Sequence, residues 1–559
     1  MKFQLTKQFV LSALTLLSSL PASAAPVAPD AGQTIRELQK QPDSNTPKAI
    51  VPLHLEGDTA RKDTVNDDAR IEVKAIHVSG SSAFAAAELE ALVADLVGSE
   101  RTLAELDKAA GRITAWYRER GYVVARAYLP VQEIKDGVVV ISVLEGRLDK
   151  QRVSNQSRLS DERANDYLSG IKSGDTLQAQ PVDRMLLLLT DTPGVGGARA
   201  TLQPGASVGT SDLLIELDPS APYFANVELD NYGNRYTGEY RLDGALALSS
   251  PLKMGDQLTL RALTSDKNLT YARIAYQIPV GGSGLRVGAA YSDIRYRLGK
   301  EFTALQAHGT ATSGSLFAVY PFIRSQASNL SATLTWEDKK LGDRTDAPIT
   351  TSDKYVQLAN LGLAGNHQDA LGGAGLTSFD LSLAAGRLSM DTVSRAADAT
   401  SAQSNGAFTR LAYNLNRLQR LTDRNTLSVA LAGQQAGKNL NSSEKFFLGG
   451  AYGVRAYPQG EGSGDEGWLA NLELRHSFND TLQGMLFYDA GSVTFNRNQF
   501  AAAANTRYIS GAGVGANANL AGVQIKTYLA WRTGGGRPTS EPVTLNRNPR
   551  LWLQASKQF

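Results

Sequence analysis

Only one stretch of the sequence has the spacing of a catalytic nucleophile motif. Residues Gly205 to Gly209 read Gly-Ala-Ser-Val-Gly, which matches the Gly-x-Ser-x-Gly elbow of serine hydrolases. That elbow needs a strand before the serine and a helix after it, because the sharp turn between them exposes the hydroxyl. Here Pro204 precedes the stretch, and the alternation of a strand follows at Asp212 to Leu217. The pattern therefore predicts a turn and not a nucleophile.

Residues that bind metals or carry redox chemistry are sparse. The chain has no cysteine and five histidines, none of which lies at a metal-ligand spacing from another. It contains no phosphate-binding loop, and a formal net charge of +2 gives no electrostatic argument for nucleic acid. We therefore predict that the protein is not an enzyme, holds no metal or cofactor, and has no nucleic-acid partner.

The first 24 residues have the pattern of a secretory signal. Lys2 and Lys7 precede an apolar stretch from Phe9 to Leu20, and Ala22-Ser23-Ala24 supplies the small residues that signal peptidase requires. The apolar stretch is too short to span a bilayer as a helix, so an uncleaved anchor is the weaker alternative. We expect residues 1–24 to be removed and the mature chain to be exported.

Residues 25–70 are rich in Pro, Asp, Gln and Thr and contain one helix candidate. It runs from Gly32 to Gln41, with Asp30 placed to cap it and Pro42 placed to end it. The segment that follows, 43–70, has the composition of a linker and reaches up to about 90 Å when extended. We therefore expect a short helix on a tether long enough to cross a membrane.

Residues 71–219 predict two successive modules that mix helices and strands. In the first, at 71–149, we expect strands at 71–78, 123–129 and 138–144 and helices at 85–97 and 102–120. In the second, at 150–219, we expect helices at 161–168 and 182–190 and a closing strand at 212–217. Both have a β-α-α-β-β order, which indicates an internal repeat in pattern without identity.

From Ser220 to Phe559 the chain consists of segments that alternate apolar with small or polar residues. Leu330 to Trp336, Val523 to Trp531 and Arg273 to Ile278 are examples. Such strands suit a barrel with a lipid-facing exterior and a wet lumen, because closure leaves no unpaired backbone edge in hydrocarbon. The length suits about sixteen antiparallel strands. A large soluble β-sandwich or propeller would alternate too and is the open alternative.

Several motifs, in order, resemble one protein family. They are Asp191-Thr192-Pro193-Gly194-Val195, Leu202-Gln203-Pro204-Gly205, the hairpin from Leu229 to Tyr240, and the stretch Gly449 to Pro458. Together they resemble the TpsB transporters of two-partner secretion, the haemolysin secretion/activation protein family. The C-terminal segment, which ends on Phe559, also resembles the terminal strand of outer-membrane barrels. The resemblance implies an N-terminal plug helix, two periplasmic POTRA modules and a sixteen-stranded barrel of the Omp85 superfamily.

The same resemblance implies a site inside the barrel. In the family a long extracellular loop folds back into the lumen, and its Val-Arg-Gly-Tyr tip matches four residues here, with alanine at the glycine position: Val454, Arg455, Ala456 and Tyr457. The family's Phe-x-Asp-x-Gly pattern on a barrel strand matches Phe487, Asp489 and Gly491. Because an arginine in a lumen needs a counter-charge, we expect Arg455 to pair with Asp489. A solvated Arg455 beside a merely lumen-facing Asp489 is the alternative.

The alternation of side chains along a strand predicts which neighbours of Arg455 and Asp489 face the lumen and which face lipid. Phe487 and Asp489 share one face of their strand, opposite Leu486 and Tyr488, which we expect to contact lipid. On the preceding strand three polar residues share a face that we expect to line the lumen: Asn471, Glu473 and Arg475.

We therefore expect a translocator in the outer membrane, surrounded by lipid, with its N-terminal modules in the periplasm. It would capture a large secreted exoprotein, such as an adhesin or haemolysin, and export it to the cell surface. An Omp85-type factor that inserts other barrels is the main alternative, although such factors usually carry more modules and no plug. A small-solute porin leaves residues 25–219 unexplained, and an outer-membrane esterase lacks a credible Ser/His/Asp set.

Overall fold

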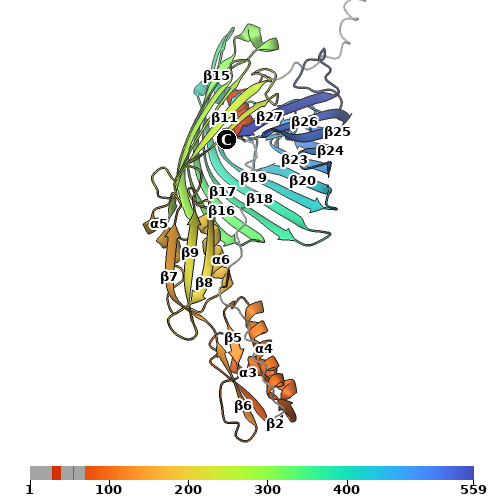
Figure 1. Cartoon of the computed structure of the whole chain (residues 1–559). Coiled ribbons are helices and arrows are strands. Elements are labelled where there is room, and N and C mark those ends of the chain that lie inside the picture. The colour runs from red at the N-terminus through yellow and green to blue at the C-terminus, as the bar shows by residue number, and fades with distance from the viewer. Residues whose placement is uncertain (1–27, 40–53, 56–69) are drawn as a thin grey trace, which may run out of the picture.

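The computed structural model describes residues 28–39, 54–55 and 70–559. Within them, two small α+β modules lead into a closed barrel of sixteen antiparallel strands (Figure 1). The expected fold class is therefore confirmed, and the soluble sandwich and propeller are wrong. The expected signal at 1–24 and most of the linker lie outside the described residues. No helix in the described part of the chain is long and apolar enough to cross a membrane.

The first module is built from two small sheets and its helices. Its elements are β2 (Arg70–Val73), β3 (Ala75–Ser79), α3 (Ala86–Ala91), the 3-10 turn η1 (Ala94–Leu96), β4 (Ser99–Thr102), α4 (Leu103–Glu119), β5 (Arg126–Tyr128) and β6 (Val138–Leu144). Helix α4 begins at a capping box, in which Thr102 accepts a bond from the Glu105 amide and Glu105 accepts one from the Thr102 amide.

Two expectations for this module are wrong in detail. The single strand expected at 71–78 is two strands, because the amide of Lys74 donates to the carbonyl of Gly137 (2.8 Å) and redirects the chain from β4 towards β6. The helix expected at 85–97 ends at Ala91. Val93, with φ of −124°, has left the helical region, and a short 3-10 turn follows.

The second module contains β7 (Arg147–Asn155), α5 (Asp161–Leu168), α6 (Ala179–Thr190), β8 (Gly197–Pro204) and β9 (Thr210–Asp218). The boundary expected between residues 149 and 150 falls inside β7, so this module starts at Arg147. The Gly205 to Gly209 stretch is the turn between β8 and β9, and the Gly205 amide donates to the carbonyl of Thr210 (3.0 Å). The turn expected there is confirmed.

A short piece of the linker joins the second module. Strand β1 (His54–Leu55) pairs in parallel with Thr201 and Leu202 of β8. The resulting sheet has the order β1-β8-β9-β7, so β1 occupies what would otherwise be the free edge of β8. No sequence pattern predicts this pairing, because two residues carry no periodicity.

The barrel closes where its first strand pairs with its last. Glu228 of the first strand lies opposite Ser556 of the last, in an antiparallel register. The strands are β10 (Tyr223–Asp230), β11 (Arg241–Ser249), β12 (Gln257–Ser265), β13 (Thr270–Val280), β14 (Leu285–Arg297), β15 (His308–Arg324), β16 (Ser328–Asp346), β17 (Ile349–Asp369), β18 (Gly375–Met390), β19 (Gly406–Arg420), β20 (Asn425–Ala436), β23 (Glu466–Ser477), β24 (Leu482–Thr494), β25 (Thr506–Leu520), β26 (Val523–Gly534) and β27 (Arg550–Gln558). Closure pairs every strand on both sides, as a bilayer requires.

Alternation along each strand separates the outer wall from the lumen. On β16, Leu334 and Trp336 are 58% and 51% exposed and point outwards. On β27, Leu551 and Leu553 also point outwards, whereas Trp552 between them is buried inside. The outer wall therefore carries large apolar side chains where lipid would contact it, which agrees with the two-faced strands expected from the sequence.

Direct contacts fix the second module to the near end of the barrel. Arg324 of β15 donates to both carboxylate oxygens of Asp191 (2.6 and 2.9 Å), and Arg184 of α6 donates to the carbonyl of Pro321 (2.7 Å). The Ser160 amide ahead of α5 donates to the carbonyl of Lys253 in the β11–β12 turn (2.9 Å). These turns therefore mark the end of the barrel that we expect to face the periplasm.

Helix α2 (Ala31–Gln39) packs against inward-facing residues of the barrel wall (Figure 1). Asp30 caps it, accepting a bond from the Gln33 amide (2.8 Å). Its apolar residues Ala31, Ile35 and Leu38 are buried in a cluster that includes barrel side chains such as Ile294, Leu341 and Phe408. The helix expected at 32–41 thus begins at Ala31, and its described part ends at Gln39.

Candidate functional site: a luminal loop and its anchors

The connection between β20 and β23 turns back inside the barrel. Its two short strands, β21 (Phe446–Phe447) and β22 (Ser463–Gly464), pair with each other, and a bridge joins Gly449 to Val454. Gly450 has φ of +114°, a conformation that side chains rarely adopt, so glycine is required at this turn. The four tip residues, Val454 to Tyr457, are each at most 3% exposed. The tip is therefore packed against the inner face of the barrel wall.

Arg455 at the tip contacts Asp489 of β24 through a paired, charge-assisted arrangement. Its Nε and Nη2 donate to the two carboxylate oxygens of Asp489 at 2.8 and 2.6 Å. The backbone amide of Arg455 donates to the same carboxylate at 3.1 Å. Asp489 is fully buried and Arg455 is 3% exposed. Such a fork fixes both the position and the orientation of the loop tip.

The three polar residues expected on the neighbouring strand surround this pair. Glu473 accepts a third bond from Nη1 of Arg455 (2.6 Å), so the guanidinium bridges two carboxylates. Arg475 donates to the other oxygen of Glu473 and balances its charge. Asn471 donates to Asp489 (2.7 Å) and to the carbonyl of Gly453 (3.1 Å). All three face the lumen.

Aromatic residues close the site around the guanidinium. Its carbon lies 3.6 Å from the ring centre of Phe487 and 5.0 Å from that of Tyr528 on β26, which are cation–π distances. The indole of Trp552 on β27 donates to the carbonyl of Arg455 (2.7 Å). Tyr528 and Trp552 were not among the expected site residues. Alternation alone puts both on the inner wall, but nothing in the sequence gives their height relative to Arg455.

Two further expected residues have steric roles. Ala456 is not among the residues with positive φ, so alanine in place of the family's glycine strains no backbone. The side chain of Ala456 packs against the backbone of Gly511 on β25. A Cβ added to Gly511 would lie 2.4 Å from the Cβ of Ala456, so glycine is needed at position 511. Gly491 on β24 leaves room for Leu448, since a Cβ there would lie 2.6 Å from the leucine Cδ2.

A second anchor holds the returning half of the loop. The fully buried carboxylate of Glu461 accepts bonds from Arg507 (2.6 Å) and from the backbone amides of Thr539 and Ser540 (both 2.9 Å). The hydroxyl of Tyr457 donates to the carbonyl of Gly534 (2.6 Å). Glu461 was also missed from the sequence, where the only signal was an acidic residue in a glycine-rich loop.

The first half of the same connection holds helix α2. The turn η3 (Ser442–Glu444) places Glu444, fully buried, 2.8 Å from Lys339 and 3.3 Å from Arg410 on the wall. Ser442 donates to the carboxylate of Asp30 (2.7 Å) at the start of the helix. Gly32 lies so close to Ser442 that any side chain there would clash. One connection therefore contacts both the helix and the β24 anchor.

No group of His, Asp or Glu in residues 28–39, 54–55 and 70–559 has the geometry to hold a metal ion. The site thus consists of charge pairs and aromatic packing that position a loop. We call this set of contacts, which holds the loop tip against the barrel wall, the lock.

Comparisons with known proteins identify the lineage. The family described as haemolysin secretion/activation protein ShlB/FhaC/HecB matches residues 209–518, and the ShlB-type POTRA domain matches residues 71–146. The heme/hemopexin transporter protein HuxB of Haemophilus influenzae is 30% identical over 480 residues, 84% of each chain. The hemolysin transporter protein ShlB of Serratia marcescens is 24% identical over 495 residues, 85% of this chain and 84% of that one.

Solved structures give the same architecture. CdiB from Escherichia coli superimposes with a TM-score of 0.70 at 19% identity, covering 99% of this chain and 98% of that one. BamA from Haemophilus ducreyi gives a TM-score of 0.50 at 13% identity, covering 87% and 100%. These structures share the fold with this chain. Taken with the family matches, they show that the chain belongs to the haemolysin secretion/activation protein family and is an outer-membrane translocator of two-partner secretion.

Proposed function

We propose that the protein exports one large secreted exoprotein, which the periplasmic modules select and which passes through the barrel lumen. The observation that carries this proposal is the filling of that lumen by two separable parts, helix α2 and the luminal loop, both held by side-chain contacts. A pore that must pass a chain needs such parts to be displaceable.

Helix α2 acts in this proposal as a resting plug. Only three of its side chains join the apolar cluster, and polar contacts provide the remainder of the docking. The Ala31 amide donates to Asp343 (2.8 Å), and Gln39 donates to Glu337 (3.0 Å). Hydrogen bonds to carboxylates contribute about 1.5–3 kcal/mol each, so the helix can leave the lumen without unfolding the wall.

The modules recognise the exoprotein by adding one of its segments to an exposed sheet edge. Backbone bonds at an edge bind any extended chain, and the neighbouring side chains select among sequences. The edge of β8 is already occupied by β1 from the linker. An extended segment of the exoprotein that used this edge would have to displace β1. Capture of the partner would then pull on the linker that carries α2.

The partner's identity rests on the relatives. Those compared above are transporters for a haemolysin and for a heme/hemopexin system. We infer a secreted exoprotein of comparable type, with no nucleic acid involved. Outer-membrane lipid surrounds the barrel. No nucleoside triphosphate site was found in the sequence, so folding of the exoprotein outside the cell supplies the driving force.

Exchange of the modules tests this proposal. Residues 71–218 would be replaced by those of a relative that exports a different exoprotein, and both exoproteins would be assayed at the cell surface. We expect the exchange to redirect export, with heat-modifiable mobility confirming that the barrel is folded. Export of the original exoprotein by the chimaera would contradict recognition by the modules.

Loss of the plug is tested separately in planar bilayers. A chain without residues 25–70 should conduct more than the full chain, because the lumen would lose α2. Unchanged conductance would contradict the plug.

A further inference from the structure

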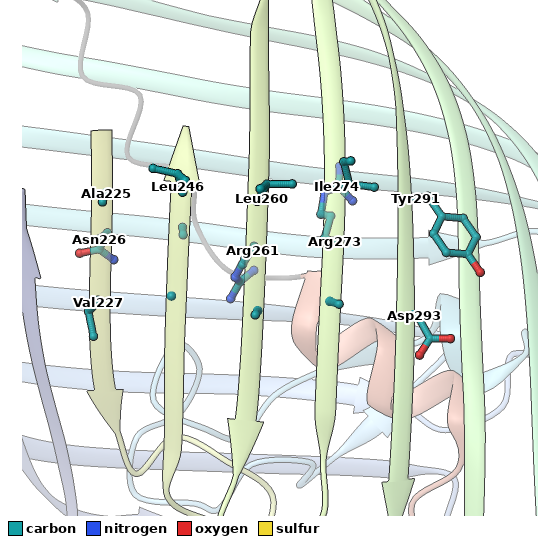
Figure 2. Close-up of a pocket in the computed structure, with 14 residues that line it drawn as sticks. Ala225, Asn226, Val227, Leu246, Leu260, Arg261, Arg273, Ile274, Tyr291 and Asp293 are labelled. Atoms are coloured by element: carbon teal, nitrogen blue, oxygen red, sulfur yellow. The ribbon is translucent and has the colours of Figure 1, made fainter. Parts of the chain in front are cut away.

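A dent with a cavity volume of about 550 Å³ lies across strands β10 to β14, and Figure 2 shows the residues that line it. Four of its apolar side chains are among the exposed ones on the outer wall: Val227, Leu260, Ile274 and Tyr291. Arg261, which also lines it, alternates to the inner side, where it pairs with Asp243. We call this feature the wall dent. It opens on the lipid side of the barrel.

The floor of the wall dent is low because three neighbours in register have almost no side chain. Gly244 of β11 lies opposite Ala262 of β12, which lies opposite Ala272 of β13. A Cβ added to Gly244 would meet nothing within 4 Å, so the space above it is open. One side of this row carries large apolar side chains in register: Leu246, Leu260, Ile274 and Tyr291. The other side carries Leu242, Thr264, Thr270 and Arg295. The dent is therefore a trough with an apolar wall on one side and not a flat surface.

Positive charge lies at one end of the trough. Asp293 of β14 is opposite Ala272 and closes the floor row. Two and four residues further along the same face come Arg295 and Arg297, both exposed. Arg295 contacts Asp293 (3.1 Å) with its side chain 74% exposed, so solvent or a ligand still reaches it. Arg297 has no carboxylate partner among the ion pairs of the described residues.

The direction of the strands shows which leaflet of the membrane lies beside the arginine end of the trough. The second module contacts the β11–β12 and β15–β16 turns, which places the periplasm there. Strand β14 starts at that end with Leu285 and finishes at the opposite end with Arg297. Arg295 and Arg297 therefore lie towards the cell surface, above an apolar trough that faces lipid.

We propose that the wall dent and the two arginines bind a phosphorylated glycolipid of the outer leaflet. An acyl chain lies in the trough over Gly244, Ala262 and Ala272, and a headgroup phosphate accepts bonds from Arg295 and Arg297. Guanidinium groups suit phosphate because they donate two parallel bonds. A protein partner is disfavoured at this place, because each of these strands is paired on both sides and offers no backbone edge.

The test measures lipid retention by the full chain purified in detergent. Native mass spectrometry would count bound bisphosphorylated lipid A, with the same lipid lacking both phosphates as the comparison. Gly244→Leu fills the trough, and the double substitution Arg295→Gln and Arg297→Gln removes the charges. Two variants serve as controls. Ala385→Leu adds a leucine at an exposed position of β18, away from the wall dent. Arg387→Gln removes an exposed cation from β18.

We expect wild type and both controls to retain bisphosphorylated lipid A in preference to the lipid without phosphates. Each site variant should bind it about tenfold more weakly, the loss expected for one or two charge-assisted bonds or for a filled acyl trough. Heat-modifiable mobility would confirm folding, and the arginine variant carries the test if Gly244→Leu misfolds. The proposal is overturned if wild type shows no preference for the phosphorylated lipid, or if folded site variants retain as much as the controls.

Discussion

Replacing Arg455 with alanine removes every charged contact at the loop tip. The guanidinium makes two bonds to Asp489, at 2.8 and 2.6 Å, and one to Glu473 at 2.6 Å. Afterwards Asp489 stays fully buried, with only Asn471 and a backbone amide as donors. Breaking a buried ion pair from one side costs about 3–5 kcal/mol. That cost would raise the population of released loop about a hundredfold to a few thousandfold.

The conservative variant separates charge from geometry. Lysine at position 455 keeps a positive charge but donates from a single nitrogen, so it cannot contact Asp489 in pairs and also reach Glu473. We expect an intermediate loss. Arg475→Ala is the matched control, because Arg475 contacts Glu473 alone and its side chain is 32% exposed. Its effect should be small, because Glu473 keeps its bond to Arg455 when Arg475 is removed.

Two assays measure the result. Export of the exoprotein should fall sharply for Arg455→Ala and for Asp489→Ala and partly for Arg455→Lys, while Arg475→Ala exports normally. Protease added to intact cells should cut the loop between Gly449 and Gly467 faster in the first two variants. Heat-modifiable mobility verifies insertion. Normal export together with unchanged proteolysis in both alanine variants would refute the lock.

Exchanging the charges of Arg455 and Asp489 should give a result that depends on Glu473, the second carboxylate that contacts Arg455. Aspartate at 455 with arginine at 489 would restore an opposite pair, but it would place the new carboxylate next to Glu473. Like charges at this distance destabilise each other in a partly desolvated site. The swapped variant should therefore export no better than the single variants. Adding Glu473→Gln to the swap should improve export, and absence of any improvement would contradict the role given to Glu473.

Three further predictions concern the plug and the modules. Gly32→Leu should raise resting conductance, because a side chain there clashes with Ser442 and undocks α2; conductance equal to wild type would contradict this docking. Burial raises the pKa of Glu37 from 4.5 to about 7. Docking is therefore fully favoured below about 4.5 and loses this contribution as pH rises through about 7, so conductance should increase across that window. Glu37→Gln should reduce the pH dependence. Arg324→Ala removes the fork to Asp191 and should increase the mobility of the second module, measured by electron paramagnetic resonance, with barrel stability unchanged.

The sequence predicted elements where local pattern dominates. Helix α5 spans the expected 161–168, and β6 spans the expected 138–144. The number of barrel strands followed from length and alternation. Contacts that depend on register did not follow. Alternation puts Tyr528 and Trp552 on the inner wall, but only the shear of the closed barrel sets them level with Arg455.

Short or irregular segments escaped prediction for a related reason. Strand β4 is too short for periodicity to stand out. Helix α7 (Thr392–Ala399) is as long as α5 but lies in a connection of the barrel, where only alternating strands were expected. Glu461 binds backbone amides of a distant loop, and no local pattern encodes such a contact. The candidate site was located through the family resemblance, which supplied Arg455 and Asp489 together. Physical reasoning from the sequence supplied only the need for a counter-charge.

Passage of the exoprotein through the lumen is tested most directly by crosslinking during export. Lys526 of β26 points into the lumen, and its neighbour Ile525 points to lipid. A photo-crosslinking amino acid would be placed at each position in cells that export the exoprotein, with the transit intermediate held by a folded domain fused to it. The account predicts crosslinks to the exoprotein from position 526 and none from position 525. Crosslinks from position 525 alone, or from neither position while the intermediate is trapped, would contradict it.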